Sequence, residues 1–456
     1  MSDALDANRI ARRNITIVNA LSFLNNAMFV VPIIVVYYAA QKHVGLTGFL
    51  ISEAAFAMAM VMMEVPSGYL SDTWKRKYAL LLGFVIQTIG FVVMFLGEGF
   101  LLMVAAQAIC GLGMSFVSGT GSALIYDSLL GADKAKAAQV KAEDNGPALT
   151  QWLTNSPSRS RYKAVLLASL FSKAAKPVGV DQYSKISGRM HAYGMVGAAV
   201  SALLGGYIYS VGVELPAILS AVSMAVAALF TLKLVEVERQ RESAKNNPIK
   251  EMASVVKYAL AGHKEVASIL LFSSSVFVVC NLMFFLHQSY WIEGGIDIKQ
   301  FGLLMAIGMM VNALGSSLAY ALESRLRFVH MVAIIAALPL LSYGLAVVLP
   351  FGAGIYALFL GGLAWGMGRP LMEAAVNRRI ESSRRSTVLS VGSVLHRMAF
   401  VPLTFVAGPV AEAYGVKAAM MALLVLMTIT AGASLLVMAR SGLLAVRETS
   451  EVTQNA

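Results

Sequence analysis

The chain has 456 residues, of which 58% are hydrophobic and only 13% are charged, and its mean hydropathy is +0.70. Soluble domains usually contain roughly 45–50% apolar and about 25% charged residues, so this composition excludes an ordinary soluble enzyme, a secreted disulfide scaffold and a disordered chain. At about 20 apolar residues for each bilayer crossing, the length accommodates a dozen spans. We therefore expect an integral membrane protein.

Twelve apolar segments are long enough to cross a bilayer, and a segment in lipid must be helical to satisfy its own backbone polar groups. They cover residues 14–40, 46–71, 78–97, 100–130, 188–211, 215–235, 266–291, 300–322, 328–349, 352–376, 387–413 and 418–439. The predicted fold is therefore an all-α integral membrane protein with twelve transmembrane helices in two pseudo-symmetric six-helix bundles.

The lengths of the polar connections predict how the chain is divided. We expect a first bundle over 1–235, with a cytoplasmic insertion at about 131–187, and a second bundle over 266–440. A central cytoplasmic linker at 236–265 separates the two bundles, and residues 441–456 form a cytoplasmic tail.

The net charge of +11 comes from basic residues that gather in alternate connections. If the N-terminus is cytoplasmic, 31 of the 36 Lys and Arg residues lie in or beside cytoplasmic segments, and only Lys42, Lys299 and Lys417 lie outside. Basic residues concentrate on the cytoplasmic side of membrane proteins. Both termini are therefore expected in the cytoplasm, with the protein in a plasma membrane such as the bacterial inner membrane. The basic charge then implies no nucleic-acid partner.

The sequence contains no recognisable catalytic or metal-binding motif. Cys110 and Cys280 lie in apolar runs and are expected to be small core residues. Six scattered histidines form no zinc-protease pair, and neither a phosphate-binding loop nor a nucleophile elbow occurs. We expect no enzyme activity, no metal and no cofactor.

A short charge pattern repeats in the two predicted bundles. Asp72 precedes Arg76 by four residues at the end of segment 46–71, and Glu323 precedes Arg327 by four at the end of segment 300–322. The match supports two related halves, as in transporters with internal repeats.

The first copy of this pattern resembles the signature Gly-x-x-x-Asp-x-x-Gly-Arg-Lys/Arg of the major facilitator superfamily. Gly68, Asp72, Arg76 and Lys77 match it, whereas Lys75 stands where the family usually has glycine. The resemblance covers nearly the whole chain apart from the predicted insertion.

Two further stretches resemble the drug-exporter-like, proton-antiporter branch of the superfamily. They are Glu64-Val-Pro-Ser-Gly68 and Ala123-Leu-Ile-Tyr-Asp127-Ser-Leu129. The segment 188–211 also matches four of the six positions of the branch's antiporter motif, at Gly188, Gly197, Gly205 and Gly206. Ser201 and Ala202 replace the Gly-Pro of that motif.

The resemblance implies a fold, a mechanism and partners. Two bundles would rock around a central cavity lined by the first, second, fourth, fifth, seventh, eighth, tenth and eleventh helices. A charge cluster of Asp72, Arg76 and Asp127 would hold the cytoplasmic side closed, and Gly68, Lys77, Glu323 and Arg327 complete this expected conformational latch. The expected partners are a small-molecule substrate, protons and the lipid bilayer, with the chain acting as a monomer.

Ionisable residues inside a membrane are costly and are therefore candidates for function. Glu53 and Glu64 are eleven residues apart, which puts them on one helix face about 16 Å from each other. Glu64 is the first candidate for proton coupling, and Glu53 and Asp127 are further candidates. A purely structural, neutralised glutamate is the alternative.

Further polar residues in the apolar segments are candidates for the substrate cavity. Arg369 and Glu373 have the i, i+4 spacing of a helical ion pair, which leaves Arg397 to face an acid of the other half, an anionic substrate or the membrane interface. The full set is Asn25, Asn26, Gln107, His287, Gln288, Arg369, Glu373, His396 and Arg397.

The sequence thus predicts a secondary active transporter that works by alternating access and exports small amphipathic compounds in exchange for protons. A proton-coupled carrier of an anionic metabolite or siderophore is the alternative, motivated by Arg369 and Arg397. A sensor or scaffold built on a carrier fold is a further, less favoured reading.

Overall fold

The computed structural model describes residues 2–144, 178–237, 262–323, 325–380 and 385–444, and helices account for most of them. Within these ranges, eleven helical segments are long and apolar enough to cross a membrane, and a twelfth apolar helix is shorter. The predicted all-α membrane fold is therefore confirmed. Most of the predicted insertion and linker, and most of the tail, lie outside the described residues.

The first half of the chain contains the first six spans. Its elements are α1 (Ser2–Asn26), η1 (Val31–Ile33), α2 (Ile34–Gln41), α3 (Leu46–Thr73), α4 (Arg76–Leu96), α5 (Gly99–Val117), α6 (Thr120–Asp144), η2 (Val180–Gln182), α9 (Tyr183–Val211) and α10 (Leu215–Thr231). The second half contains α12 (Lys264–Glu293), α13 (Ile298–Glu323), α14 (Phe328–Val348), α15 (Phe351–Asn377), α16 (Arg385–Tyr414) and α17 (Val416–Arg440).

Two segments that the sequence predicts as single helices are interrupted. The first span is divided into α1, η1 and α2, with Pro32 in the connecting turn of 3-10 helix. The fourth span is divided into α5 and α6 at Ser118 and Gly119, and Gly119 has a φ of +78°. A side chain is strongly disfavoured in that left-handed conformation, so glycine allows the chain to leave the helix at this point.

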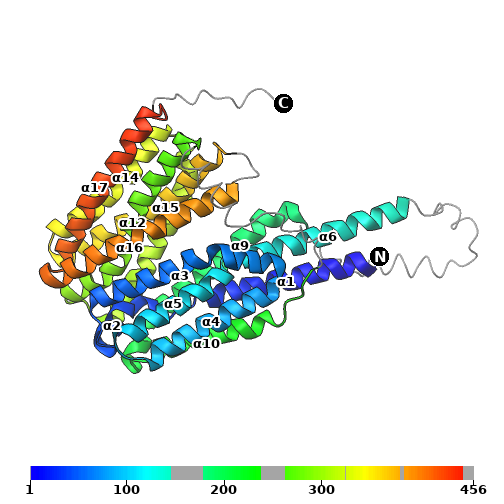
Figure 1. Ribbon diagram of the computed structural model, residues 1–456, viewed down its shortest axis with the longest axis horizontal. Coiled ribbons are helices and arrows are strands. Elements are labelled where there is room, and N and C mark those ends of the chain that lie inside the picture. Colours follow the sequence, from blue (N-terminus) through cyan, green and yellow to red (C-terminus); the bar gives the residue numbers. More distant parts are fainter. Residues whose placement is uncertain (1, 145–177, 238–261, 324, 381–384, 445–456) are drawn as a thin grey trace, which may run out of the picture.

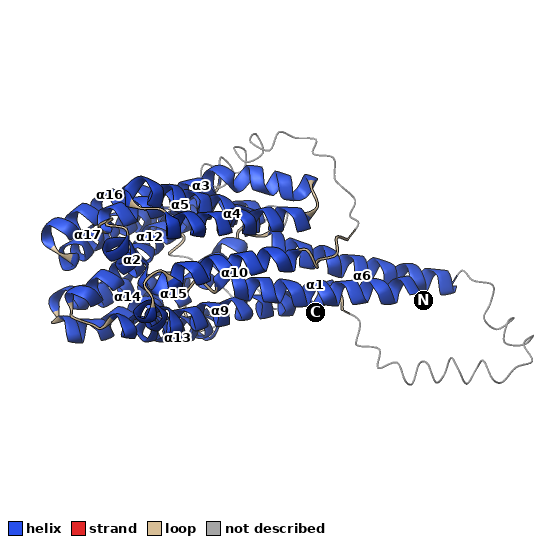
Figure 2. Ribbon diagram, turned by 90° about the horizontal axis from the view of Figure 1, so that it is seen from below, coloured by secondary structure: helices blue, strands red, loops and turns tan. Residues whose placement is uncertain are grey.

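The two halves diverge from one another toward one end of the molecule. Figure 1 shows them meeting near α2 and separating toward the end at which α1 begins and α17 ends. At that end α1 and α6 lie side by side and extend beyond the other helices (Figure 2). The molecule is thus closed at one end and open at the other.

At the closed end, helices of the two halves pack against each other, most extensively in two places. One contact joins α9 to α13, where a side chain on Gly206 would lie 2.5 Å from the carbonyl oxygen of Ile298. The other joins α3 to α16, where the Glu412 carboxylate accepts hydrogen bonds from the backbone N–H and the hydroxyl of Thr47, at 2.9 and 2.6 Å. Small residues and polar contacts are typical of close helix packing in membranes.

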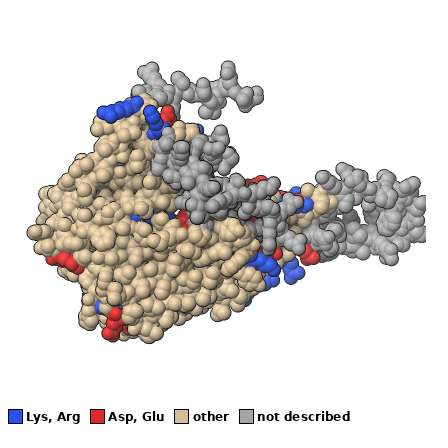
Figure 3. Space-filling model, in the orientation of Figure 1, with Lys and Arg blue, Asp and Glu red and all other residues tan. Residues whose placement is uncertain are grey.

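The surface between the two ends is apolar. Figure 3 shows Lys, Arg, Asp and Glu near the ends of the visible face and a broad uncharged band between them. Exposed side chains on the described spans include Leu229, Met310, Leu314, Phe405 and Leu436. Such a band fits the hydrocarbon layer of a bilayer.

Candidate functional site

A central cavity of about 690 Å³ lies between the two halves. It is lined by side chains of α3, α12, α15 and α16 and by residues at the end of α5, among them Ser118 at the break in the fourth span. Irregular backbone inside a membrane protein is tolerated where it lines a cavity, and this break is such a place. The charged and imidazole side chains on the wall are Glu53, Glu64, Arg369, Glu373, His396 and Arg397.

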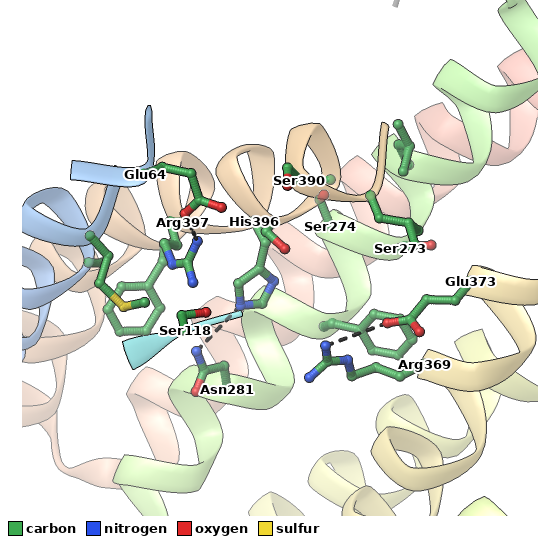
Figure 4. A pocket seen from close by; sticks show the side chains of 18 of the residues that line it. Glu64, Ser118, Ser273, Ser274, Asn281, Arg369, Glu373, Ser390, His396 and Arg397 are labelled. Atoms are coloured by element: carbon green, nitrogen blue, oxygen red, sulfur yellow. Dashed lines mark hydrogen bonds and ion pairs between the residues drawn. The ribbon is translucent and has the colours of Figure 1, made fainter. Parts of the chain in front are cut away.

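An ion pair crosses the cavity from one half to the other. Arg397 on α16 donates to the Glu64 carboxylate on α3 at 3.3 Å, and the two side chains are 22% and 28% exposed (Figure 4). Each charge thus has an opposite partner while remaining in contact with the cavity. The sequence suggested Glu64 for proton coupling and Arg397 for the substrate cavity. The structure pairs these two residues, so the partner of Arg397 is an acid of the other half.

A second ion pair lies within α15. The guanidinium of Arg369 is 3.5 Å from the carboxylate of Glu373, which is the neighbour that the i, i+4 spacing predicts. Both side chains are about half-exposed, at 57% and 49%, so the pair is open to the cavity. The Arg369 guanidinium also lies 5.9 Å from the ring centre of Trp365, within the range of a cation–π contact.

The remaining acid of the cavity is held by an amide. The side chain of Gln107 on α5 donates a hydrogen bond to the carboxylate of Glu53 on α3. Glu53 and Glu64 both face the cavity from the same side of α3. Gln107 does not line the cavity and is connected to it through its hydrogen bond to Glu53. Among the described residues, the carboxylate of Glu53 accepts this hydrogen bond but forms no ion pair, in contrast to that of Glu64.

His396 lies between the cavity and the interior of the second half. Its Nε2 is 3.4 Å from the amide nitrogen of Asn281 on α12, and its ring makes an edge contact with Trp365 on α15. Asn281 and Trp365 line the central cavity and also a second cavity described below. Asn281 and Trp365 therefore lie where the two cavities adjoin, and His396 contacts both residues from the side of the central cavity.

Besides Gln107, four residues expected in the substrate cavity do not line it. The Gln288 amide donates to the carbonyl of Val31 and accepts from the N–H of Val35, at 2.9 and 3.0 Å, so it joins the halves at the closed end. Asn26 donates to the carbonyl of its own helix at Ser22, and Asn25 is buried. His287 lines the second cavity instead.

The expected latch is present in part at the open end. Arg76 at the start of α4 and Asp127 on α6 are 3.0 Å apart. Asp72 lies on α3 next to its last residue, Thr73, and Gly68 lies one turn earlier.

Glu236 adds to this latch and was not predicted, because it follows α10 and is far from the motif in sequence. Its carboxylate accepts hydrogen bonds from the N–H groups of Arg76 and Lys77, at 2.9 and 3.1 Å. It therefore caps the N-terminus of α4, where a negative charge is favourable.

The matching pattern in the second half is paired differently from the expectation. Glu323 at the end of α13 pairs with Arg378 at the end of α15, and Arg327 is the N-cap residue of α14. Arg378 was not nominated, because helix ends that meet in space are not neighbours in sequence. In the first half the pair joins the third and fourth spans, and in the second half it joins the eighth and tenth spans.

The glycines of the fifth-span motif have packing roles that differ along α9. Side chains on Gly197 and Gly205 would enter the backbone of Phe23 and Phe29 in the first span. A side chain on Gly206 would meet the other half at Ile298, and one on Gly188 would meet nothing within 4 Å.

Serines on the cavity wall were missed by the sequence interpretation. They are Ser118, Ser273, Ser274, Ser390 and Ser393. Ser273 donates to the carbonyl of Ile269 in its own helix, as serines in apolar helices commonly do. The sequence carries no signal that separates these from packing serines. Within the described residues, no group of three or more His, Cys, Asp or Glu side chains could hold a metal ion.

Comparison with known proteins is consistent with this architecture. Residues 15–138 and 163–401 match the family described as Major Facilitator Superfamily. No curated protein matches the sequence. Solved structures with a similar fold include nucleoside transporter NupG, with a TM-score of 0.68, 14% identity and coverage of 93% of this chain and 98% of that chain.

Two other transporters have similar folds. A bacterial homologue of the human lysosomal transporter Spinster, in an inward-facing and occupied conformation, has a TM-score of 0.68 and 13% identity, covering 94% of this chain and 96% of that one. A POT family transporter in complex with a thioalcohol-conjugated peptide has a TM-score of 0.65 and 12% identity, covering 95% and 97%. At these identities the likeness concerns the fold. The family match covers most of the sequence, and the chain belongs to the major facilitator superfamily of membrane transporters.

Proposed function

We propose that this transporter couples the export of small amphipathic compounds to the entry of protons by alternating access. The observation that carries the proposal is the ion pair between Glu64 and Arg397, which joins the two halves at the wall of the central cavity. A titratable acid whose partner belongs to the other half is suited to linking protonation to the relative position of the halves.

The pair suggests how a proton would act. With Glu64 ionised, its attraction to Arg397 favours the arrangement in which α3 and α16 are close at cavity depth. A proton on Glu64 removes that attraction, and this arrangement of the halves then becomes less stable relative to others. A charge left without a partner in a membrane is unfavourable, so Arg397 would next favour any state that offers another carboxylate or water.

The orientation that the basic residues predict is compatible with the proposed export. The central cavity belongs to an arrangement that is open at the end where α1 begins and α17 ends, and the positive-inside rule predicts that this end faces the cytoplasm. A compound inside the cell would then reach the cavity in this state. The solved Spinster homologue of similar fold is inward-facing, in agreement with this assignment.

The charges of the cavity favour an amphipathic substrate over an anion. Arg397 and Arg369 each have a carboxylate within 3.5 Å, so an anion would have to compete with an acid of the protein at either site. The alternative, a carrier of an anionic metabolite or siderophore, is supported by the half-exposed guanidinium of Arg369. Substrate charge therefore separates the two.

Inside-out membrane vesicles with an imposed proton gradient and a pH-reporting dye test the proposal. Cationic, neutral and anionic amphipathic compounds would be added to vesicles that contain wild type, Glu64→Gln or the control Glu98→Gln, which changes an exposed glutamate at the start of α5. We expect cationic or neutral compounds to dissipate the gradient in wild type and Glu98→Gln but not in Glu64→Gln. Equal proton release in Glu64→Gln would contradict the role of Glu64, and a response to anions alone would favour the alternative.

A further inference from the structure

A second cavity of about 350 Å³ lies between α12, α13, α14 and α15 of the second half, and Met195 of α9 in the first half also lines it. Its wall is mainly aromatic and apolar, with Phe284, Trp291, Tyr343, Phe359 and Trp365 among the lining side chains. Because of this composition we call it the aromatic pocket. Pockets with such walls and few polar groups bind drug-sized apolar moieties.

The aromatic pocket has polar atoms that lack partners. Trp291 is only 3% exposed, and its Nε1–H has no hydrogen-bond partner among the described residues. The same holds for Nε2 of His287, whose ring lies 6.2 Å from that of Trp291. A buried donor without a partner is unfavourable, so a ligand whose acceptor this N–H reaches when the Trp291 ring turns toward the pocket would relieve that cost.

The aromatic pocket adjoins the charged part of the central cavity. Asn281 and Trp365 line both cavities, and the Arg369 guanidinium lies over the Trp365 ring at 5.9 Å. A molecule that extends past Trp365 from one cavity into the other would therefore meet the ion pair of Arg369 and Glu373 at one end and aromatic rings at the other. These two environments, one charged and one aromatic, suit a molecule with a charged or strongly polar head and an aromatic tail.

We propose that the aromatic pocket binds the uncharged aromatic part of the substrate, and that this part carries a hydrogen-bond acceptor, such as a carbonyl oxygen, that receives the Trp291 N–H. The inference rests on the proposed transport of amphipathic compounds and names the chemical class of their apolar end. The aromatic rings supply the affinity for a flat apolar group, and Trp291 supplies the preference for an acceptor.

Gly308 provides a way to fill the pocket without disturbing its walls. It lines the pocket, and a Cβ on it would meet only Phe359, at 4.0 Å. The variant Gly308→Leu therefore places a side chain in free space of the pocket. Gly432→Leu on α17 is the matched control, because a Cβ there meets nothing within 4 Å and the residue lines neither cavity.

Tryptophan fluorescence reports binding directly, since two of the four tryptophans of the chain line the pocket. In a Trp74→Phe/Trp152→Phe background, purified protein would be titrated with 4′-bromoacetophenone and with 1-bromo-4-ethylbenzene, which lacks the carbonyl. We expect saturable quenching by the ketone at a concentration at least threefold lower than for the hydrocarbon. Gly308→Leu should raise the ketone's half-saturation at least tenfold, and Gly432→Leu should leave it unchanged.

Removing the donor tests the acceptor part of the inference. Trp291→Phe retains Trp365 as the reporter and should abolish the preference for the ketone while leaving the hydrocarbon's half-saturation within twofold. Quenching that is not saturable, or that is the same in Gly308→Leu as in Gly432→Leu, would overturn the pocket as a binding site. A preference for the ketone that persists in Trp291→Phe would overturn the role of that N–H.

The test is independent of proton coupling, because it uses no gradient and does not involve Glu64. If the probes bind as expected but Glu64→Gln still exchanges protons in vesicles, the proposed coupling fails and the pocket remains. If the probes do not bind and the vesicle assay succeeds, the pocket fails and the proposed coupling remains.

Discussion

Arg397 and Glu64 are 333 residues apart in sequence, and their charged groups lie 3.3 Å from each other across the interface between the two halves. The pair connects α16 to α3 on the wall of the central cavity. Each member is the ionic partner of the other, so a change at either position alters the environment of the other.

The first prediction concerns the stability of this ion pair. Arg397→Gln leaves the Glu64 carboxylate without its cation, and we expect the free energy of unfolding to fall by about 1–3 kcal/mol. The double variant Glu64→Gln/Arg397→Gln should recover part of that loss, because no charge is then left alone. Unfolding of the purified protein by denaturant measures both values.

The ion pair of Arg369 and Glu373 is the control for this experiment. It lies within one helix and is about half-exposed, so Arg369→Gln should cost only about 0–1 kcal/mol. Equal costs for Arg397→Gln and Arg369→Gln would show that the pair across the halves has no special energetic role.

The second prediction concerns the contact between Glu412 and Thr47 at the closed end. Glu412→Ala removes two hydrogen bonds to a carboxylate, each worth about 1.5–3 kcal/mol when well formed. We expect the halves to separate there in a larger fraction of molecules. Spin labels at the exposed Val213 and Val348, one in each half, would report a population at longer distance. An unchanged distance distribution would mean that other contacts hold this end closed.

The third prediction uses the close approach of α9 and α13. A leucine at Gly206 has no room beside the carbonyl of Ile298, so Gly206→Leu should prevent the closed-end contact and strongly reduce transport. Gly188→Leu is the matched control in the same helix, because a side chain there meets nothing within 4 Å. The same pair of spin labels and a transport assay measure the two variants. Equal transport in both would contradict a gating role for this contact.

The fourth prediction concerns the cap that Glu236 places on α4. Glu236→Ala removes the acceptor of the Arg76 and Lys77 N–H groups, and we expect about 1 kcal/mol less stability. Glu98→Ala is the comparison, since Glu98 occupies the N-cap of α5 without a side-chain hydrogen bond and should cost less. Denaturant unfolding distinguishes the two, and equal losses would exclude a capping role.

Periodicity and composition predicted the membrane fold because they depend on each segment alone. The twelve apolar segments, the shared face of Glu53 and Glu64 and the spacing of Arg369 and Glu373 are all properties of single helices. The break at Pro32 was missed because an apolar run continues through it, and the break at Gly119 was missed because the short Ser-Gly-Thr-Gly-Ser stretch at 118–122 hardly lowers the hydropathy averaged over a whole span.

Contacts between helices were not predictable in the same way. Nothing in the sequence near Glu323 indicates that its partner is Arg378 and not Arg327, because that choice depends on how two helices lie against each other. Gln288 was assigned to the cavity from its depth, yet the rotation of α12 directs it to the backbone of η1 and α2. The sequence predicts which residues need partners, and the packing of helices decides which partners they find.

The interruption at Ser118 and Gly119 has a mechanical consequence for the fourth span. Because the helical hydrogen-bond ladder stops there, α5 and α6 are two rigid rods with a joint at the depth of the cavity. α5 carries Gln107, which contacts Glu53, and α6 carries Asp127, which pairs with Arg76. We therefore expect α6 to turn about this joint as the open end closes, with little change at the Glu53 carboxylate that α5 holds.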